Sequence, residues 1–585
     1  MLYSDTISNV LYIDLSTKHF WIKQRADVFE KYLGGTGAAT ALLSEECPKG
    51  VTPFSPDNPI ILSVGPLTAL FPLASKTVAM FKSPHTENLG ESHCGGRSAV
   101  AIRMAGYGAI VIKGASDTPV YLAIHGDKIY FRDAATLWGI QNSFTVGRII
   151  RENEPGAGFR TIMRIGGAGE KLVPYACVTT ETYRHFGRLG LGAVFGSKKL
   201  KAIVISGKRS LTVADKNQYR LVYDEIFESS TSSPIMKKYH DLGTAGNVMP
   251  LNSIGALPTR NLNEQRFDAA SNISGETITE QYLGRRLACS HCPVGCIHIA
   301  ALREQYLDQP YFYKTSMISY DYEPIFAIGS MLGIGEAAAF FKLMERIEIY
   351  GLDVMSTGVV LAWATEAFKR GLISEKETRG LGFDWGGSAF YMDAVKYIVE
   401  QPNEFYKHLA QGVEKVSSVY GGKDFALSFG GNEMSGYNTG PAAYAGILVG
   451  ARHSHLDNAG YSVDQKNIDG NYVKSEDVAT TLIEEERWRQ ILSSLVVCFF
   501  ARAIYTPDLV SRALKSIGFN YSPADLILLG HTIHAEKYKY KIREGFDLDK
   551  LRLPKRILEI NTPSGQLHEQ YIRDVIKNYK NQIGS

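Results

Sequence analysis

The spacing of apolar residues along the chain changes near residue 210. Before that point, short β-branched or alternating runs are separated by Gly-rich turns, which is typical of strands. Two of these turns are short enough to predict hairpins, after Leu15 and at His125-Gly-Asp127. The predicted strands are Val10–Leu15, His19–Lys23, Pro59–Val64, Ala109–Lys113, Tyr121–Ile124, Lys128–Arg132, Arg160–Ile165 and Lys201–Ser206. Only two helices are predicted in this part, Gly37–Glu46 and Val146–Asn153.

After residue 212, apolar residues recur mostly at helical spacing. The predicted helices are Ala214–Ser229, Ala337–Ile349, Val359–Arg370, Ala394–Glu400, Asn403–Tyr420, Thr480–Phe500 and Ala524–Tyr538. The pattern therefore predicts an α+β protein with a β-rich domain at 1–210. We expect two mostly helical domains to follow, at 211–422 and 423–585, because Gly421-Gly422 ends a predicted helix.

The composition is that of a folded globular protein. Of the 585 residues, 45% are hydrophobic and 21% are charged, which excludes a disordered chain. The formal charge of +3 gives no argument for binding nucleic acid or an anionic membrane. The longest apolar run, Ile491–Ala501, is too short to span a bilayer. The first nine residues have no signal-peptide pattern, so we expect a cytoplasmic protein.

The distribution of the seven cysteines points to a metal centre. Cys289, Cys292 and Cys296 form a C-x2-C-x3-C cluster, and Pro293 and Gly295 provide turn conformations between them. Three thiols so close together in a chain with few cysteines favour metal binding over three buried, unligated thiols. Zinc would need a fourth ligand, which His291 or His298 could supply. A [4Fe–4S] cluster could take the remote Cys498 as its fourth ligand.

The N-terminal part is unusually rich in glycine, and two interpretations stay open. Gly166–Glu170 follows a predicted strand, and glycine allows backbone N–H groups to approach a phosphate. Turns between strands are an equally good explanation of each loop. Several such loops near basic residues nevertheless suggest a large anionic ligand; these residues are Lys76, Arg97, Arg184 and Arg188.

Taken together and in order, ten segments resemble the tungsten-containing aldehyde:ferredoxin oxidoreductase family over nearly the whole chain. They are Tyr32-Leu-Gly-Gly-Thr-Gly37, Gly65-Pro-Leu-Thr68, Lys82-Ser-Pro84, Gly95-Gly96, Ala105-Gly-Tyr107, Gly167-Ala-Gly-Glu170, Gly190–Ala202, the cysteine cluster, Gly351-Leu-Asp353 and Cys498. The resemblance implies a β-rich base for a tungsten ion, or molybdenum, held by two pyranopterins. Mg²⁺ would link the pterin phosphates. It also implies a [4Fe–4S] cluster on Cys289, Cys292, Cys296 and Cys498.

The resemblance also implies cofactor-binding residues, with some departures from the family pattern. Lys76 stands where an arginine usually bridges cluster and pterin, and His93 stands for an asparagine near the magnesium. The other expected contacts are Gly95, Arg184, His185, Glu348, Leu352 and Asp353. The second pterin motif is reduced to its cysteine, Ser493-Ser-Leu-Val-Val-Cys498.

Three residues are expected to be catalytic by the same resemblance: Glu323, His455 and Tyr322. Glu323 precedes an apolar run, so we expect burial to raise its pKa and make it a general base. The alternative is a helix-start glutamate stabilised by the helix dipole. His453, two residues from His455, could take the histidine role instead. Tyr437 could line the pocket, although core packing is its commoner role.

The implied reaction is oxidation of a small-molecule aldehyde to the acid, with electrons passing through the cluster to ferredoxin or an iron–sulfur subunit. One alternative is the reverse chemistry, in which an activated acid or an aromatic thioester is reduced at low potential. A second is an iron–sulfur or zinc protein that only binds a partner.

Overall fold

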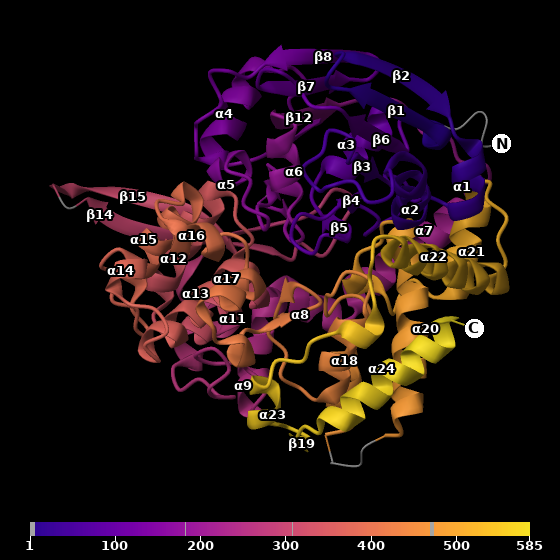
Figure 1. Cartoon of the computed structure of the whole chain (residues 1–585). Helices are drawn as coiled ribbons and strands as arrows, with labels where there is room; N and C mark the ends of the chain where they lie inside the picture. Colours follow the sequence, from indigo (N-terminus) through magenta and orange to yellow (C-terminus); the bar gives the residue numbers. More distant parts are fainter. Residues whose placement is uncertain (1–5, 182, 307, 469–472, 585) are drawn as a thin grey trace. The chain divides into compact units, whose positions relative to one another are not determined.

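The structure is a computed structural model that describes residues 6–181, 183–306, 308–468 and 473–584 (Figure 1). The chain forms two compact units whose segments interleave along the sequence. Unit 1 comprises residues 1–237, 288–295 and 484–546. Unit 2 comprises residues 238–287, 296–483 and 547–585. The cysteine cluster is thus divided, since Cys289 and Cys292 belong to unit 1 and Cys296 begins a segment of unit 2.

Unit 1 contains two six-stranded mixed sheets. The strand order of the first is β2 (His19–Gln24), β1 (Asn9–Asp14), β6 (Ala109–Lys113), β3 (Ile60–Ser63), β4 (Thr77–Lys82) and β5 (Leu89–Cys94). β1 and β6 are parallel, and the other neighbours are antiparallel. The predicted hairpin of β1 and β2 is confirmed, with Asp14 opposite His19. Helix α2 (Gly35–Glu46) packs on β3 and β4, whose residues are all buried.

The strand order of the second sheet is β11 (His185–Phe186), β10 (Val178–Thr179), β9 (Arg160–Arg164), β12 (Leu200–Ser206), β7 (Val120–His125) and β8 (Lys128–Asp133). The predicted hairpin of β7 and β8 is confirmed, and Gly126 provides the positive φ of 65° in its two-residue turn. Helix α4 (Ser143–Asn153) begins at Asn142, which accepts two backbone N–H groups. Its Val146 and Ile150 pack in the core of this sheet.

The remaining helices of unit 1 are α1 (Ala26–Tyr32), α3 (Ser98–Ala105), α5 (Gly167–Glu170), α6 (Leu191–Ser197), α7 (Lys216–Ser232), α21 (Pro507–Ser516) and α22 (Pro523–Arg543). The glycines of α5 are explained by packing against α6. A Cβ added at Gly169 would lie 2.7 Å from the Gly192 carbonyl oxygen. The Glu170 carboxylate is occupied by Lys201. Close packing of two short helices therefore accounts for this loop.

Unit 2 is mostly helical around one three-stranded antiparallel sheet, β13 (Leu283–Leu287), β14 (Ile297–Tyr306) and β15 (Gln309–Tyr320). Two short hairpins are formed by β16 (Ser428–Phe429) with β17 (Asn432–Glu433) and by β18 (Asn561–Thr562) with β19 (Gly565–Gln566). Its helices are α9 (Val248–Ser253), α10 (Gly275–Tyr282), α11 (Tyr322–Ile328), α12 (Ala337–Tyr350), α13 (Val354–Lys369), α14 (Glu375–Thr378), α15 (Ser388–Glu400), α16 (Glu404–Leu409), α17 (Val413–Tyr420), α18 (Pro441–Val449), α19 (Gly460–Lys466), α23 (Arg556–Glu559) and α24 (Glu569–Gly584). Helices α8 (Pro234–Leu242) and α20 (Ser475–Ser494) each cross a boundary between the units.

Two predicted helices continue past residues at which the structure ends a helix. The helix predicted at Asn403–Tyr420 is two helices, because Gly412 between α16 and α17 has a φ of 99° that a helix does not allow. The helix predicted at Thr480–Phe500 ends at Ser494, and Val496 has a φ of 54°. Cys498 therefore lies in extended backbone after the helix, ahead of a short 3₁₀ turn at Phe499–Ala501.

The β14–β15 hairpin was missed by the sequence pattern. Residues 309–315 of β15 are exposed on both faces, so the period-two alternation that marks a half-buried strand is absent there. Only its last residues are buried, and they lead directly into α11. The hairpin therefore connects the cysteine segment, which lies between β13 and β14, to the helix that carries Glu323.

Within the described ranges, no single helix is long and apolar enough to span a membrane. The segments Tyr322–Leu332 and Ala337–Tyr350 meet the length and composition requirements only as a pair, across a bend of 113°.

Close contact of α11 with α13 gives a first prediction. A Cβ added at Gly358 of α13 would lie 2.1 Å from the Ala327 carbonyl oxygen, a backbone atom that has little room to move. We expect Gly358→Ala to destabilise unit 2 by ~1–3 kcal/mol. The lower melting temperature would be measured by differential scanning calorimetry. Gly382→Ala is the control, since no atom lies within 4 Å of its added Cβ. A parental melting temperature for Gly358→Ala would contradict the packing argument.

Candidate active site

The side chain of Glu323 is at the centre of a group of polar residues in unit 2. It lies in the first turn of α11, where Asp321 precedes the helix. Tyr437 donates its hydroxyl to Glu323 Oε1 at 3.0 Å. His455 Nε2 lies 3.3 Å from the same oxygen. The tyrosine and histidine rings are 4.9 Å apart, and Tyr461 stacks on Tyr437 at 4.6 Å.

The balance of burial and hydrogen bonding sets the charge of this carboxylate. Burial raises the pKa of Glu323, but the hydrogen bonds from His455 and Tyr437 and the charge of His455 lower it, and the net pKa lies below the ordinary value. Our expectation of a raised pKa was therefore wrong, because the sequence showed the apolar neighbours but not the two donors. Burial and the nearby Glu323 in turn raise the pKa of Tyr437 well above its ordinary value. The site thus holds an ionised carboxylate beside a neutral phenol.

Tyr322, the neighbour of Glu323, holds the segment that carries Tyr437. Its side chain is fully buried, and its hydroxyl donates to the carbonyl oxygen of Gly436. Gly436 has a φ of 85° and lies against the ring of Phe326. This contact fixes the segment that carries Tyr437 onto α11. The structure therefore gives Tyr322 a positioning contact.

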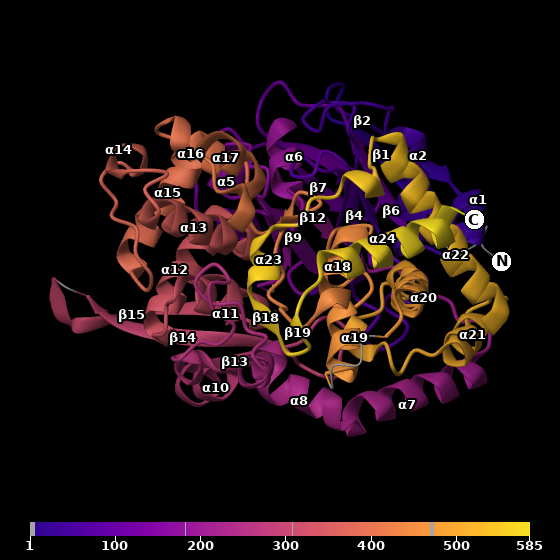
Figure 2. The ribbon, with the colours of Figure 1, turned by 60° about the horizontal axis from the view of Figure 1, so that its bottom comes forward.

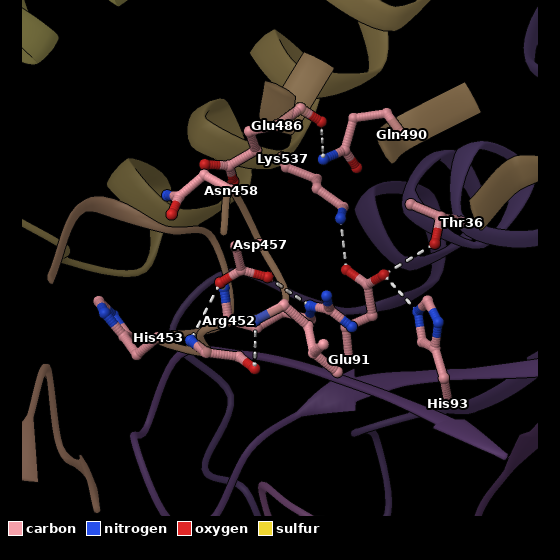
Figure 3. A network of polar contacts seen from close by, with 12 residues as sticks. Thr36, Glu91, His93, Arg452, His453, Asp457, Asn458, Glu486, Gln490 and Lys537 are labelled. Carbon is pink, nitrogen blue, oxygen red and sulfur yellow. Dashed lines mark hydrogen bonds and ion pairs between the residues drawn. The ribbon is translucent and has the colours of Figure 1, made fainter. Parts of the chain in front are cut away.

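His455 is positioned by a loop that a buried ion pair organises (Figure 3). Arg452 Nε lies 2.6 Å from Asp457 Oδ1, and both side chains are almost fully buried. Asp457 Oδ2 accepts the backbone N–H groups of Arg452 and Ser454. One carboxylate thus satisfies three donors of the loop, which reduces the cost of burying its charge.

The structure separates the roles of the two histidines in this loop. His453 has a φ of 53°, and its ring lies against Gly430 with Nδ1 3.2 Å from the Ile447 carbonyl oxygen. It is a packed residue. His455 presents Nε2 to Glu323, while its buried Nδ1 has no hydrogen-bond partner among the described residues. An unsatisfied buried nitrogen is costly in a native structure, so His455 is suited to bind a further group.

In unit 1, one short loop holds two of the cysteine segments. The backbone N–H of Leu73 donates to the His291 carbonyl oxygen, and its own carbonyl accepts the N–H of Cys498. Lys76 N–H donates to Val496. Cys289, Cys292 and Cys498 are all partly exposed thiols without a disulfide. The chain thus brings Cys498 into the same loop region as the cluster motif from about 200 positions away.

Glycine is required at position 95, directly after β5, because Cys289 and Lys76 pack closely against it. An added Cβ would lie 2.8 Å from the Cys289 sulfur and 3.2 Å from the Lys76 ammonium nitrogen. Ser290 N–H donates to the Gly96 carbonyl oxygen. The Cys289 thiol and the Lys76 ammonium group therefore both lie beside Gly95. A nearby cation favours the thiolate form, which is the form that binds an iron–sulfur cluster.

The zinc alternative loses one of its candidate ligands. Both ring nitrogens of His298 in unit 2 face backbone carbonyl oxygens, those of Cys296 at 3.2 Å and of His240 at 3.0 Å. In the described part of the chain, no three His, Cys, Asp or Glu side chains are close enough to hold a single metal ion.

Basic side chains gather around β9 and β11 in unit 1. Burial and the charges of Arg184 and Arg164 lower the pKa of His185 to about 3, so its ring is neutral. Burial lowers the pKa of Arg164 to about 10, and its guanidinium donates to the Ser143 carbonyl oxygen. Arg164 was not among the predicted site residues, because an arginine in a buried strand gives no pattern of its own. This concentration of positive charge suits an anionic ligand such as a phosphate.

His93 belongs to a second buried network, also drawn in Figure 3. Its Nε2 lies 2.7 Å from Glu91 Oε1, which also accepts the Thr36 hydroxyl at 2.7 Å. Lys537 of α22 lies 2.5 Å from the other oxygen of Glu91. The carboxylate thus joins β5, α2 and α22.

The predicted pterin motif of unit 2 forms a helix junction. Glu348 is buried and accepts the Ser319 hydroxyl at 2.9 Å. Leu352 N–H donates to the Ile347 carbonyl oxygen at the end of α12. Asp353 caps α13 by accepting the N–H of Ser356. The structure therefore gives this motif a local structural role; whether it also contacts a pterin stays a prediction.

Comparison with known proteins matches nearly the whole chain. A family model described as aldehyde ferredoxin oxidoreductase, N-terminal domain, matches residues 10–207. The model for domains 2 and 3 of the same family matches residues 222–584. The tungsten-containing aldehyde ferredoxin oxidoreductase of Thermococcus kodakarensis is 31% identical over 575 residues, which cover 95% of this chain and 92% of the relative.

Two further similarities widen the range of chemistry found on this fold. A Pyrococcus furiosus protein described as the WOR-like subunit of an aliphatic sulfonate oxidoreductase is 29% identical, covering 85% of this chain and 79% of its own length. A chain of the BamBC complex of benzoyl coenzyme A reductase, solved with 1,5-dienoyl-CoA, has a TM-score of 0.82 at 20% identity. That superposition covers 99% of this chain and 94% of the solved one. On the evidence of both family models and the T. kodakarensis relative, this chain belongs to the tungsten-containing aldehyde ferredoxin oxidoreductase family and is an oxidoreductase.

Proposed function

We propose that the protein oxidises an aldehyde to the carboxylic acid and passes the electrons to ferredoxin or an iron–sulfur subunit. Aldehyde and water give the acid, two protons and two electrons, and the electrons leave one at a time. The observation that carries the proposal is the pairing of an ionised Glu323 with a His455 whose second nitrogen is buried and has no hydrogen-bond partner in the described part of the chain.

These two side chains can handle the protons and the carbonyl oxygen. The Glu323 carboxylate accepts a proton from water, or from the aldehyde hydrate, as the new C–O bond forms. His455 donates to Glu323 through Nε2–H. Its Nδ1 can accept from a hydroxyl of the aldehyde hydrate when the ring is neutral, and can donate to the carbonyl oxygen when the ring is protonated. Tyr437 keeps the carboxylate ionised and in place, and Tyr322 holds Tyr437.

The residues of the chain also suit the cofactors that the family implies. Tungsten on two pyranopterins would supply two-electron redox chemistry, and a [4Fe–4S] cluster would transfer single electrons. Cys289, Cys292, Cys296 and Cys498 would hold the cluster, with Lys76 beside it at Gly95. Arg184, with Arg164, would bind pterin phosphate, where Mg²⁺ is also expected. We expect the protein in the cytoplasm, where thiols stay reduced.

A reductive role is the second candidate. The solved chain with the same fold comes from a benzoyl coenzyme A reductase, and that similarity supports testing the reduction of an aromatic thioester. Assays with oxidised viologen and aldehydes, and with reduced viologen and thioesters, would separate the two directions.

The contacts of Glu323 give a prediction for activity. We expect Glu323→Gln to lower kcat by roughly 10²–10⁴-fold, because the general base is lost. In Tyr437→Phe, the carboxylate loses a donor that lowers its pKa. That pKa should rise, and the acid limb of the kcat/KM profile should move to higher pH. Both variants would be assayed with a viologen dye, with tungsten and iron content measured alongside.

Tyr461→Phe is the matched control, since it removes a hydroxyl but keeps the ring that stacks on Tyr437. It should leave the acid limb in place. An unchanged profile for Tyr437→Phe, or full activity of Glu323→Gln, would contradict the assigned roles.

The cysteines give a prediction for metal content. Anaerobically purified protein should contain about one tungsten and about four irons per chain. Cys498→Ala should lose most of the iron and the visible absorbance of the cluster, whereas Cys177→Ala, which removes a buried thiol outside the cysteine motif, should keep both. Mass spectrometry of metals and absorbance spectra would decide. Zinc without iron would refute the cluster, and unchanged iron in Cys498→Ala would refute its role as ligand.

A further inference from the structure

A cavity of about 390 Å³ opens on the surface of unit 1. One wall is the Glu225–Ser229 stripe of α7, and another is Ile235 and Met236 at the start of α8. The third wall is the segment that leads into α21. Figure 2 shows α7 and α21 lying side by side, as their contacts also indicate. Six of the ten lining residues are apolar, and the polar ones include Glu225 and Ser229 of α7.

The third wall belongs to the segment that begins at Cys498. Phe500, Ala503 and Ile504 line the cavity. Between them and α21, Tyr505 is fully buried, and its hydroxyl donates to the Pro72 carbonyl oxygen. Pro72 precedes Leu73, whose backbone binds both the His291 carbonyl oxygen and the N–H of Cys498. The wall of the cavity therefore begins two residues after Cys498, in the segment that Leu73 holds beside the His291 segment.

The mouth of the cavity exposes apolar side chains in the folded chain. Ile235 is 48% exposed at the rim. Leu221, one helical turn before Glu225 on the same side of α7, is 67% exposed. Glu225 itself is neutralised by Arg512 of α21, with two contacts of 2.7 and 2.8 Å. A surface with apolar rim residues and internally paired charge is typical of the centre of a protein interface.

We propose that this cavity, with Ile235 and Ala503 at its rim, is where a ferredoxin-type iron–sulfur protein docks and accepts single electrons. The inference rests on the proposed function for its electron supply. The occupant follows from position, because the docked protein would lie against the chain segment that carries Cys498, which Leu73 ties to the His291 segment. A partner side chain inserted in the cavity would act as the apolar anchor that dominates such interfaces. Because the charges are paired, binding should depend little on salt.

The test compares rim variants with a matched control in the same unit. Ile235→Glu and Ala503→Glu place a charge at the rim, whereas Ile22→Glu changes an isoleucine of similar exposure, 46%, on β2. The probe is a ferredoxin with two [4Fe–4S] clusters. Its binding to each holoenzyme is measured by calorimetry, and turnover is measured with ferredoxin and with a viologen dye. Melting temperature and iron content confirm that each variant is folded and loaded.

We expect both rim variants to weaken ferredoxin binding and raise its KM by at least about tenfold, while dye turnover stays within twofold of the parental value. Ile22→Glu should behave as the parental protein. Unchanged ferredoxin binding in both rim variants would overturn the proposal, as would loss of self-association in place of ferredoxin binding. Failure of the proposed function would look different: no aldehyde turnover with the dye in any variant, including the parental protein, while the binding comparison still decides the docking site.

Discussion

A carboxylate cannot remain ionised inside a protein unless donors replace the water it has lost, and Glu323 meets this requirement with His455 and Tyr437. Several buried contacts in unit 2 hold these three side chains in place. α11 presents the carboxylate, Tyr322 fixes the Tyr437 segment through Gly436, and the Arg452–Asp457 pair shapes the loop of His455. Each support is itself buried and polar. Loss of one donor would therefore leave the buried carboxylate partly unsatisfied, a cost larger than one hydrogen bond.

In unit 1, thiols from distant parts of the chain are held in one region. Leu73 does this with its backbone alone, since its N–H and carbonyl bind the His291 and Cys498 segments. Backbone contacts of this kind do not depend on the Leu73 side chain. The side chain that does matter is the missing one at Gly95, where the Cys289 sulfur and Lys76 leave no space for a Cβ.

The two groups of candidate site residues lie mostly in different units. Unit 2 contains the buried group of Glu323, Tyr437 and His455, and unit 1 contains Cys289, Cys292, Cys498 and the basic side chains around β9 and β11. The relatives are named for aldehydes and aliphatic sulfonates, and the solved chain of the same fold comes from a benzoyl coenzyme A reductase. A fold that hosts several substrates leaves the choice of substrate to the side chains around Glu323.

The sequence by itself determined eight strands of the two large sheets, several of the longer helices, the mixed sheet-and-helix character and the family, because these depend on local periodicity and on motif order. It also singled out Glu323 and His455, through the motifs around them. It failed at Gly412 and Val496, where single residues with positive φ end helices that the apolar spacing would continue. Tertiary structure alone decided that Glu323 has a lowered pKa, that His453 packs while His455 faces the carboxylate, and that Cys498 leaves its helix. The physical reason is common to all three, because each depends on partners more than five residues away in sequence. A local sequence pattern contains no information about which distant residue will lie beside a given side chain.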